Sequence, residues 1–147
     1  MKNIISEIEL KYSPIVIKQE RISIKDSSSA YKVLLNNWNM DSIELYEEFK
    51  VLLLNRANEV LGVYALSKGG IHGTVVDIKL LFAVVLKSAS SCVILAHNHP
   101  SGNLKPSEAD KNLYFKIKRA AEYLDINVLD NLIISKDGYY SFNDEGE

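Results

Sequence analysis

The feature that most constrains this chain is an apolar strand that runs directly into two histidines. Residues 92–96 are all apolar and have the length of a buried strand, and His97 and His99 follow without a break. Side chains alternate between the two faces of a strand, so these two imidazoles point to the same side. Residues 100–106 contain Pro and Gly and predict a loop, after which a helix begins with Asp110 in its first turn. The sequence therefore predicts a strand–loop–helix unit that returns a carboxylate toward two imidazoles.

Two imidazoles and one carboxylate are a ligand set for a divalent metal. Three protein ligands and one open position for water are the arrangement of catalytic zinc sites, where zinc lowers the pKa of the water to about 7. A second interpretation stays open, because Ser107 and Asp110 also have capping-box spacing, with Ser at the N-cap and an acid at N3. Ser107 can serve both roles, whereas a ligating Asp110 must face the metal. The conjunction with His97 and His99 favours the metal site.

The hydrophobic pattern along the rest of the chain indicates an α/β protein with a central mixed sheet flanked by helices. Turn residues between the first two strands predict a hairpin, and Asp137-Gly138 predicts a second tight turn near the end of the chain. The order of elements differs from that of a doubly wound nucleotide-binding fold. Helices are predicted at residues 26–37, 77–88 and 107–124, and strands at 48–55, 60–66, 92–96, 127–135 and 139–142.

Length and composition favour one folded domain. The chain has 147 residues, of which 47% are apolar, enough for a single core. We interpret residues 41–147 as this domain, and residues 1–40 as an N-terminal extension of strands and a short helix that packs on it.

Composition also disfavours several classes of protein. Lys and Arg number 17 against 19 Asp and Glu, and a net charge of -2 argues against a protein built mainly to bind nucleic acid. The single cysteine, Cys92, excludes an internal disulfide or a paired-thiolate metal site, and is expected to be a buried apolar residue. No signal-peptide pattern and no apolar run of about 20 residues occurs, so we expect a cytoplasmic protein with no membrane association.

The spacing of the candidate ligands resembles a known signature. His97-x-His99, seven intervening residues, Ser107, two more residues and Asp110 are similar to the JAMM motif of the JAB/MPN metalloproteases. Residues 97–103 resemble the RadC-like branch of that superfamily, and the resemblance extends over about residues 48–145. It implies a JAB/MPN-like layered sandwich of the cytidine-deaminase-like type, with zinc on His97, His99 and Asp110. It also implies that Ser107 contacts the metal water or the reaction oxyanion, and that the substrate is a peptide or protein.

The chain departs from the family pattern at the catalytic glutamate. The resemblance places that general base on the strand at residues 60–66, where Ala65 stands, and no acidic residue occurs between Glu59 and Asp77. The base is therefore not identified from the sequence. Glu59, Glu47 and Glu48 are alternatives, and each is interpreted as a solvent-facing side chain. If the placement at Ala65 is correct, Ala65→Glu should raise peptidase activity.

Three functions follow as hypotheses. The first is a zinc-dependent metallopeptidase or isopeptidase. The second, favoured by the replaced glutamate, is a metal-binding scaffold with little or no turnover that recognises a peptide or protein. The third is a protein associated with DNA repair or mobile elements, as the family label suggests, but the net charge and the lack of a helix-hairpin-helix in residues 1–40 count against it. The sequence indicates no substrate-binding residue and no oligomeric state.

Two further side chains near the motif have expected roles. Asn98 lies between the two histidines and faces the other way, where it is expected to support the neighbouring loop. His72, in a glycine-rich segment, is interpreted as a solvent-exposed loop residue, with gating of the site as the alternative.

Overall fold

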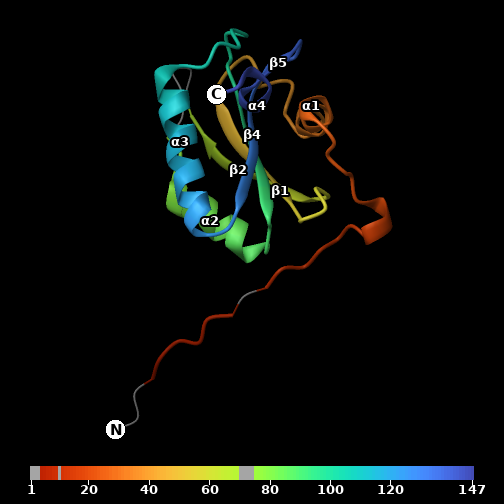
Figure 1. Ribbon diagram of the computed structural model, residues 1–147, viewed down its shortest axis with the longest axis vertical. Coiled ribbons are helices and arrows are strands. Elements are labelled where there is room, and N and C mark those ends of the chain that lie inside the picture. The colour runs from red at the N-terminus through yellow and green to blue at the C-terminus, as the bar shows by residue number, and fades with distance from the viewer. Residues whose placement is uncertain (1–3, 10, 70–74) are drawn as a thin grey trace.

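A single mixed sheet organises the described part of the protein, which in this computed structural model comprises residues 4–9, 11–69 and 75–147 (Figure 1). The strand order is β2-β1-β3-β4-β5, with β3 and β4 parallel and every other neighbouring pair antiparallel. The sheet therefore has β1 and β3 near its centre and β2 at one edge. The strands are β1 Glu48–Leu54, β2 Val60–Lys68, β3 Cys92–Asn98, β4 Asn127–Ile134 and β5 Tyr139–Ser141.

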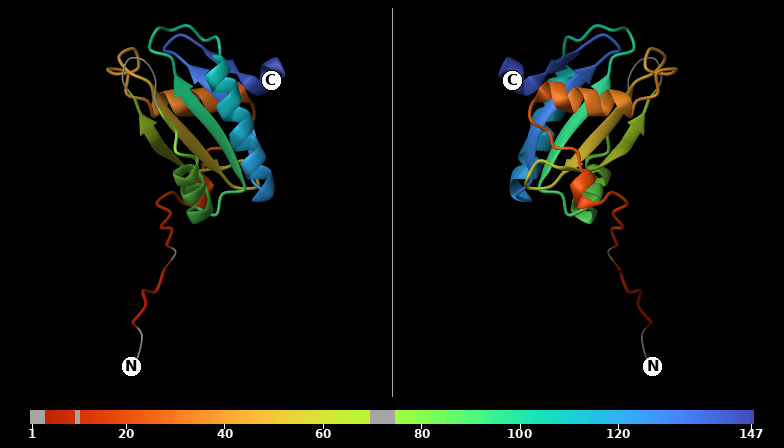
Figure 2. Two further views of the ribbon diagram at one scale, coloured as in Figure 1. Left: turned by 90° about the vertical axis from the view of Figure 1, so that its left-hand side faces the viewer. Right: turned by 90° about the vertical axis from the view of Figure 1, so that its right-hand side faces the viewer.

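Helices cover both faces of the sheet (Figure 2). α2 (Ile78–Lys87) and α3 (Glu108–Tyr123) lie on one face, and α1 (Ser27–Asn36) lies on the other. Each begins at a side-chain cap, in which an Asp or Ser oxygen accepts a hydrogen bond from a backbone N–H of the first turn. The short elements η1 (Lys18–Glu20) and α4 (Phe142–Glu145) complete the described structure. None of the helices in the described residues has the length and hydrophobicity that a membrane span requires.

Strand periodicity divides the interior into two cores. Alternate residues of β1 and β3, such as Val51 and Leu95, pack against α2 and α3, whereas the intervening ones, such as Leu52 and Ile94, pack against α1. Every residue of β3 is buried, which explains why this strand is a continuous apolar run up to its first histidine. Cys92, at its start, is a free buried thiol as the sequence predicted.

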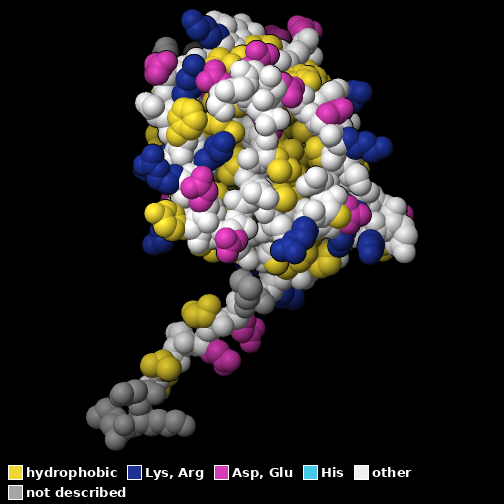
Figure 3. Space-filling view, viewed as in Figure 1, with side chains coloured by type: hydrophobic (Ala, Val, Ile, Leu, Met, Phe, Trp, Pro, Cys, Tyr) yellow, Lys and Arg dark blue, Asp and Glu magenta, His cyan; other side chains and the backbone are white. Residues whose placement is uncertain are grey.

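The predicted α/β architecture is confirmed, but the N-terminal strands are not formed in the described residues. Residues 4–9 extend away from the body, and residues 11–17 run along its end, where the Tyr12 hydroxyl donates to the Leu61 carbonyl at 3.4 Å (Figure 1). Neither segment forms a helix or strand, and their apolar side chains are exposed (Figure 3). Closer to the body, Ser23 makes one isolated bridge to Glu59. β-prone residues form a strand only where a partner strand lies beside them, and these arm residues have none among the described residues.

A buried carboxylate ties the end of the chain to the sheet. Asp130 of β4 accepts hydrogen bonds from the Ser141 hydroxyl at 2.6 Å, the Asn143 N–H at 3.0 Å and the Asn131 N–H at 2.7 Å. Burial raises the pKa of Asp130 above its usual value, and these hydrogen bonds oppose the shift only in part.

Asp130→Asn is therefore expected to remove a pH-dependent loss of stability. Because the pKa of Asp130 is raised in the folded state, that state binds the proton more readily than the unfolded chain, and ionisation costs stability as the pH rises above about 4. The free energy of unfolding of the natural chain minus that of Asp130→Asn should fall between pH 3.5 and 7, measured by urea denaturation. A difference that is constant or that rises with pH would contradict this account.

Candidate metal centre

His97 is fixed by the pairing of β3 with its neighbours. It lies opposite Phe49 of β1 and Ile133 of β4, is buried, and stacks on Phe49 with ring centroids 5.9 Å apart and an interplanar angle of 3°. His99 follows just beyond the strand, two residues on and on the same side. The Nε2 atoms of the two histidines are 3.1 Å apart.

Asp110 reaches the histidines from the first turn of α3. Its Oδ1 lies 3.3 Å from His97 Nε2, and its Oδ2 lies 3.1 Å from His99 Nε2. The Asp110 N–H also donates to Ser107 Oγ at 3.0 Å, and the Ser107 N–H donates to Asp110 Oδ2 at 2.8 Å. Asp110 thus forms the capping box and faces the histidines at the same time. From the sequence alone, these two roles of Asp110 are alternatives. The cap holds the carboxylate in the direction in which it faces the imidazoles.

The spacing of these three donors suits a tetrahedral ion. Zinc bonds to nitrogen and oxygen of about 2.0–2.1 Å place the ligand atoms of a tetrahedron about 3.3 Å apart. The two Nε2 atoms are 3.1 Å apart, and the carboxylate approaches His97 Nε2 with Oδ1 at 3.3 Å and His99 Nε2 with Oδ2 at 3.1 Å. The residues that the sequence predicted as ligands therefore lie at distances at which one ion could contact all three.

Hydrogen bonding also sets the proton position on His99. Its Nδ1 lies 2.6 Å from the backbone oxygen of Asn103, which can only accept, so Nδ1 carries the hydrogen. The lone pair of neutral His99 is then on Nε2 and points toward Asp110 and His97.

The electrostatics of the cluster keep Asp110 ionised. Burial would raise the pKa of its carboxyl group, but hydrogen bonds to His97 and His99 outweigh burial and hold the pKa well below its usual range. For His99, burial alone would lower the pKa, and the contacts with Asp110 and the Asn103 carbonyl, together with the charge of Glu47, raise it instead. A cation between these groups would meet a carboxylate that is already charged.

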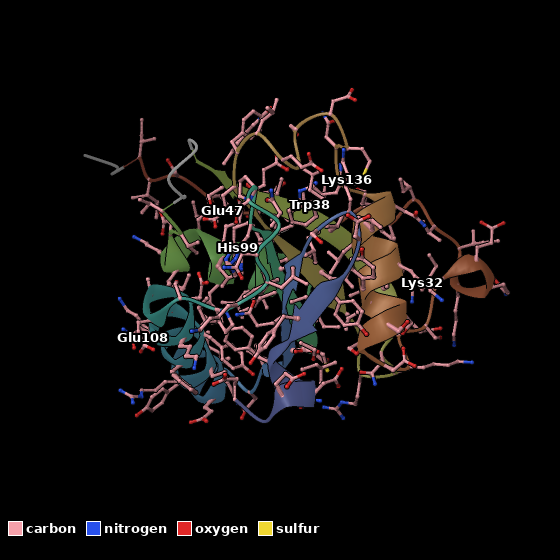
Figure 4. All side chains as sticks on the ribbon, turned by 90° about the horizontal axis from the view of Figure 1, so that it is seen from above. Lys32, Trp38, Glu47, His99, Glu108 and Lys136 are labelled. Carbon is pink, nitrogen blue, oxygen red and sulfur yellow. The ribbon has the colours of Figure 1, made fainter. Side chains whose placement is uncertain are left out.

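Glu47 is a fourth member of the cluster, and sequence reasoning had assigned it to solvent. A carboxylate oxygen of Glu47 lies within 4.8 Å of ligand atoms of both His97 and His99. Phe49 pairs with His97, and continuing this antiparallel register by two residues places Glu47 opposite His99. Figure 4 shows the two side chains next to each other.

The glutamate position inferred at Ala65 lies on the wrong face of the sheet. Ala65 pairs with Lys50 of β1, and Lys50 pairs in turn with Ala96 of β3, so these three side chains share one face. Ala96 belongs to the core under α1, whereas His97 points toward α3. Ala65 is also exposed on the edge strand β2. A glutamate at this position would not face the histidines.

The other acidic alternatives are directed elsewhere. The Glu48 carboxylate lies 3.7 Å from Lys50 Nζ and 3.8 Å from Lys68 Nζ. Glu59 accepts a hydrogen bond from the Asn55 side chain at 2.7 Å, in the turn between β1 and β2. His72 falls outside the described residues.

Asn98 anchors the segment that carries Glu47. Its side chain is fully buried, and its Oδ1 accepts from the Glu48 N–H at 2.7 Å. Its Nδ2 donates to the carbonyls of Ile43 and Tyr46, at 2.7 and 3.0 Å. The residue between the two histidines thus positions the chain on both sides of Glu47, which is a more specific role than the loop support that the sequence suggested.

A small cavity of about 80 Å³ adjoins the cluster. Glu47, His97 and Asp110 contribute to its wall, and it extends between β3, β4 and α3 to the buried side chain of Asn131. The rest of its lining is mostly apolar and includes Phe49, Val76, Leu95, Leu113 and Ile117.

A sequence model described as the RadC-like JAB domain matches residues 24–147. The chain belongs to the RadC-like JAB domain family. The match includes all five strands of the sheet, α1 to α3, and the His97–Asp110 cluster with Glu47.

Curated relatives support this assignment. The chain is similar to a UPF0758 protein of Flavobacterium johnsoniae, at 54% identity over 101 residues, which are 69% of this chain and 44% of the relative. It is 41% identical to a UPF0758 protein of Porphyromonas gingivalis over 127 residues, 86% of this chain and 55% of the relative. This RadC-like JAB chain thus spans about half the length of the curated relatives it matches.

Asn98→Ala is expected to destabilise the fold by about 3 kcal/mol or more. The substitution leaves one buried N–H and two carbonyls without their partner, and each such loss costs about 1–3 kcal/mol in part-buried to buried sites. Asn112→Ala, on the exposed surface of α3, is the matched control and should change the free energy of unfolding by less than about 0.5 kcal/mol. Equal effects of the two substitutions in urea denaturation would show that Asn98 is not an anchor.

Proposed function

We propose that this RadC-like JAB domain is a zinc-dependent hydrolase of amide bonds in peptides or proteins. The observation that carries the proposal is the approach of the Asp110 carboxylate to two imidazoles whose Nε2 atoms are 3.1 Å apart. Its Oδ1 lies 3.3 Å from His97 Nε2 and its Oδ2 lies 3.1 Å from His99 Nε2, in a site that Glu47 also faces. Two imidazoles and one carboxylate leave a tetrahedral ion one position for water.

Asp110 is the better third ligand and Glu47 the better base. Asp110 contacts both Nε2 atoms and is held there by the N-cap of a helix, whereas Glu47 is a second carboxylate at the same histidine pair that is not part of this cap. With Asp110 as the third ligand, Glu47 is the carboxylate left to contact a water bound at the fourth position. A carboxylate there can take the proton of the attacking water and pass it to the leaving amine.

When bound, zinc would lower the pKa of its water to about 7 and polarise the scissile carbonyl. Ser107 is proposed to donate a hydrogen bond to the oxyanion. Its Oγ accepts from the Asp110 N–H, so the hydroxyl hydrogen remains to be donated, and the side chain belongs to an exposed residue at the site.

The presence of Glu47 removes the main argument for an idle scaffold. That hypothesis depended on a missing general base, and Glu47 supplies a carboxylate at the histidine pair. For the DNA-associated hypothesis, the net charge of -2 gives no support. Hydrolysis of a peptide or isopeptide bond is therefore the function that the described residues support best.

The roles of the two carboxylates are separable by substitution. Glu47→Gln is expected to retain about one zinc per chain and to lose about 10²- to 10⁴-fold in kcat, the usual contribution of a general base. Asp110→Asn is expected to lose zinc as well as activity. Metal content would be measured by elemental analysis, and turnover on a panel of fluorogenic linear and isopeptide-linked peptides.

Glu48→Gln is the matched control, because the neighbouring carboxylate faces Lys50 and Lys68 instead of the histidines. It should leave both zinc content and kcat unchanged, and Ala65→Glu should not raise activity. Turnover by Glu47→Gln at the rate of the natural chain would refute the assigned base. The double variant His97→Ala/His99→Ala should bind no zinc. If the natural chain also binds none, the metal centre itself is refuted.

A further inference from the structure

Two buried polar atoms near the metal centre lack a hydrogen-bond partner among the described residues. They are Nδ1 of His97 and Oδ1 of Asn131, and the only other such side-chain atom in the described part is Nε1 of Trp38. Folded proteins satisfy nearly all buried polar groups, either directly or through an ordered water, because an unpaired one costs folding free energy. Two unpaired atoms in one region therefore indicate a ligand between them.

Both residues face the same cavity. Asn131 pairs with Leu95 in the parallel β3–β4 register, and His97, two residues further along β3, points to the same face of the sheet. Both side chains line the cavity of about 80 Å³ under α3. Such a volume exceeds the roughly 10–15 Å³ that one water needs, and a buried water needs at least two polar partners.

The chemistry of the two atoms selects the group that joins them. An imidazole that binds a metal through Nε2 carries its hydrogen on Nδ1 and must donate it. The Asn131 amide oxygen can only accept. One water molecule can accept from His97 Nδ1 and donate to Asn131 Oδ1, whereas an apolar side chain can do neither.

His99 provides the comparison within the same site. Its Nδ1 donates directly to the Asn103 carbonyl at 2.6 Å, which fixes the orientation of that ring. His97 has stacking on Phe49 but no such direct acceptor among the described residues. His97 therefore lacks the hydrogen-bond support that His99 has, unless a group in the cavity supplies it.

We propose that Asn131 is a positioning residue that orients His97 for metal binding through an ordered water in this cavity. The role rests on the proposed zinc centre, because it is the metal on Nε2 that requires Nδ1 to donate. Asn131 does not touch the metal or the substrate in this account. Its contribution is to the affinity of the site for the ion.

The test is zinc affinity, measured by chelator competition on the full chain. Asn131→Leu keeps the same branched arrangement of side-chain heavy atoms but has no acceptor, and it should weaken zinc binding about 10- to 100-fold, the usual effect of removing the partner of a metal-binding histidine. The zinc-free variant should unfold within a few degrees of the natural chain, because a water-mediated hydrogen bond is exchanged for buried apolar surface. Asn131→Asp keeps an acceptor and should retain affinity within a few-fold or increase it.

Trp38→Phe is the matched control. It removes the third unpaired polar atom, which lies in the core on the other face of the sheet, and should leave zinc affinity unchanged. Zinc affinity of Asn131→Leu equal to that of the natural chain would overturn the proposal.

A second readout is independent of metal. A high-resolution crystal structure of the zinc-free chain should contain a water within about 3 Å of both His97 Nδ1 and Asn131 Oδ1. A cavity without that water overturns the proposal. This readout uses the natural chain, so it applies even if Asn131→Leu fails to fold. Failure of the natural chain to bind zinc would instead refute the metal centre, and the water would then report separately on the Asn131–His97 link.

Discussion

The antiparallel pairing of β1 with β3 is the constraint on which the site depends. Because Phe49 lies opposite His97, the chain that enters β1 must pass His99, and Glu47 lies at that point. The same pairing buries the His97 ring against Phe49 and places Asn98 where it holds the backbone around Glu47. One strand register thus brings together the ligand strand and the proposed general base.

The helix cap performs the corresponding task on the other side of the site. Asp110 and Ser107 satisfy each other's backbone N–H groups, as the first turn of any helix requires. In doing so they orient the Asp110 carboxylate toward both imidazoles. The Ser107–Asp110 cap therefore both stabilises the start of α3 and positions a ligand. Loss of the cap is expected to disturb the metal centre more than the sheet.

The parts of this site that lie close together in the chain were predictable from the sequence. His97, His99, Ser107 and Asp110 belong to one strand–loop–helix unit, and their approach follows from strand alternation and helix-start signals. Glu47 was missed because its position depends on which strand lies beside β3, and a strand's own alternation does not give that. The expected glutamate position, Ala65, lies on β2, which forms the sheet edge and is separated from β3 by β1. The N-terminal strands were overpredicted for a related reason, since β-propensity does not supply a partner strand.

The central claim is that His97, His99 and Asp110 hold one ion while Glu47 stays outside its coordination shell. A crystal structure of the zinc-loaded chain, with the ion located by anomalous scattering, tests this most directly. The account predicts bonds of about 2.0–2.2 Å from zinc to both Nε2 atoms and to an Asp110 oxygen, with Glu47 reaching the ion only through water. A zinc ion bonded directly to Glu47, with Asp110 retained only as a helix cap, would contradict it.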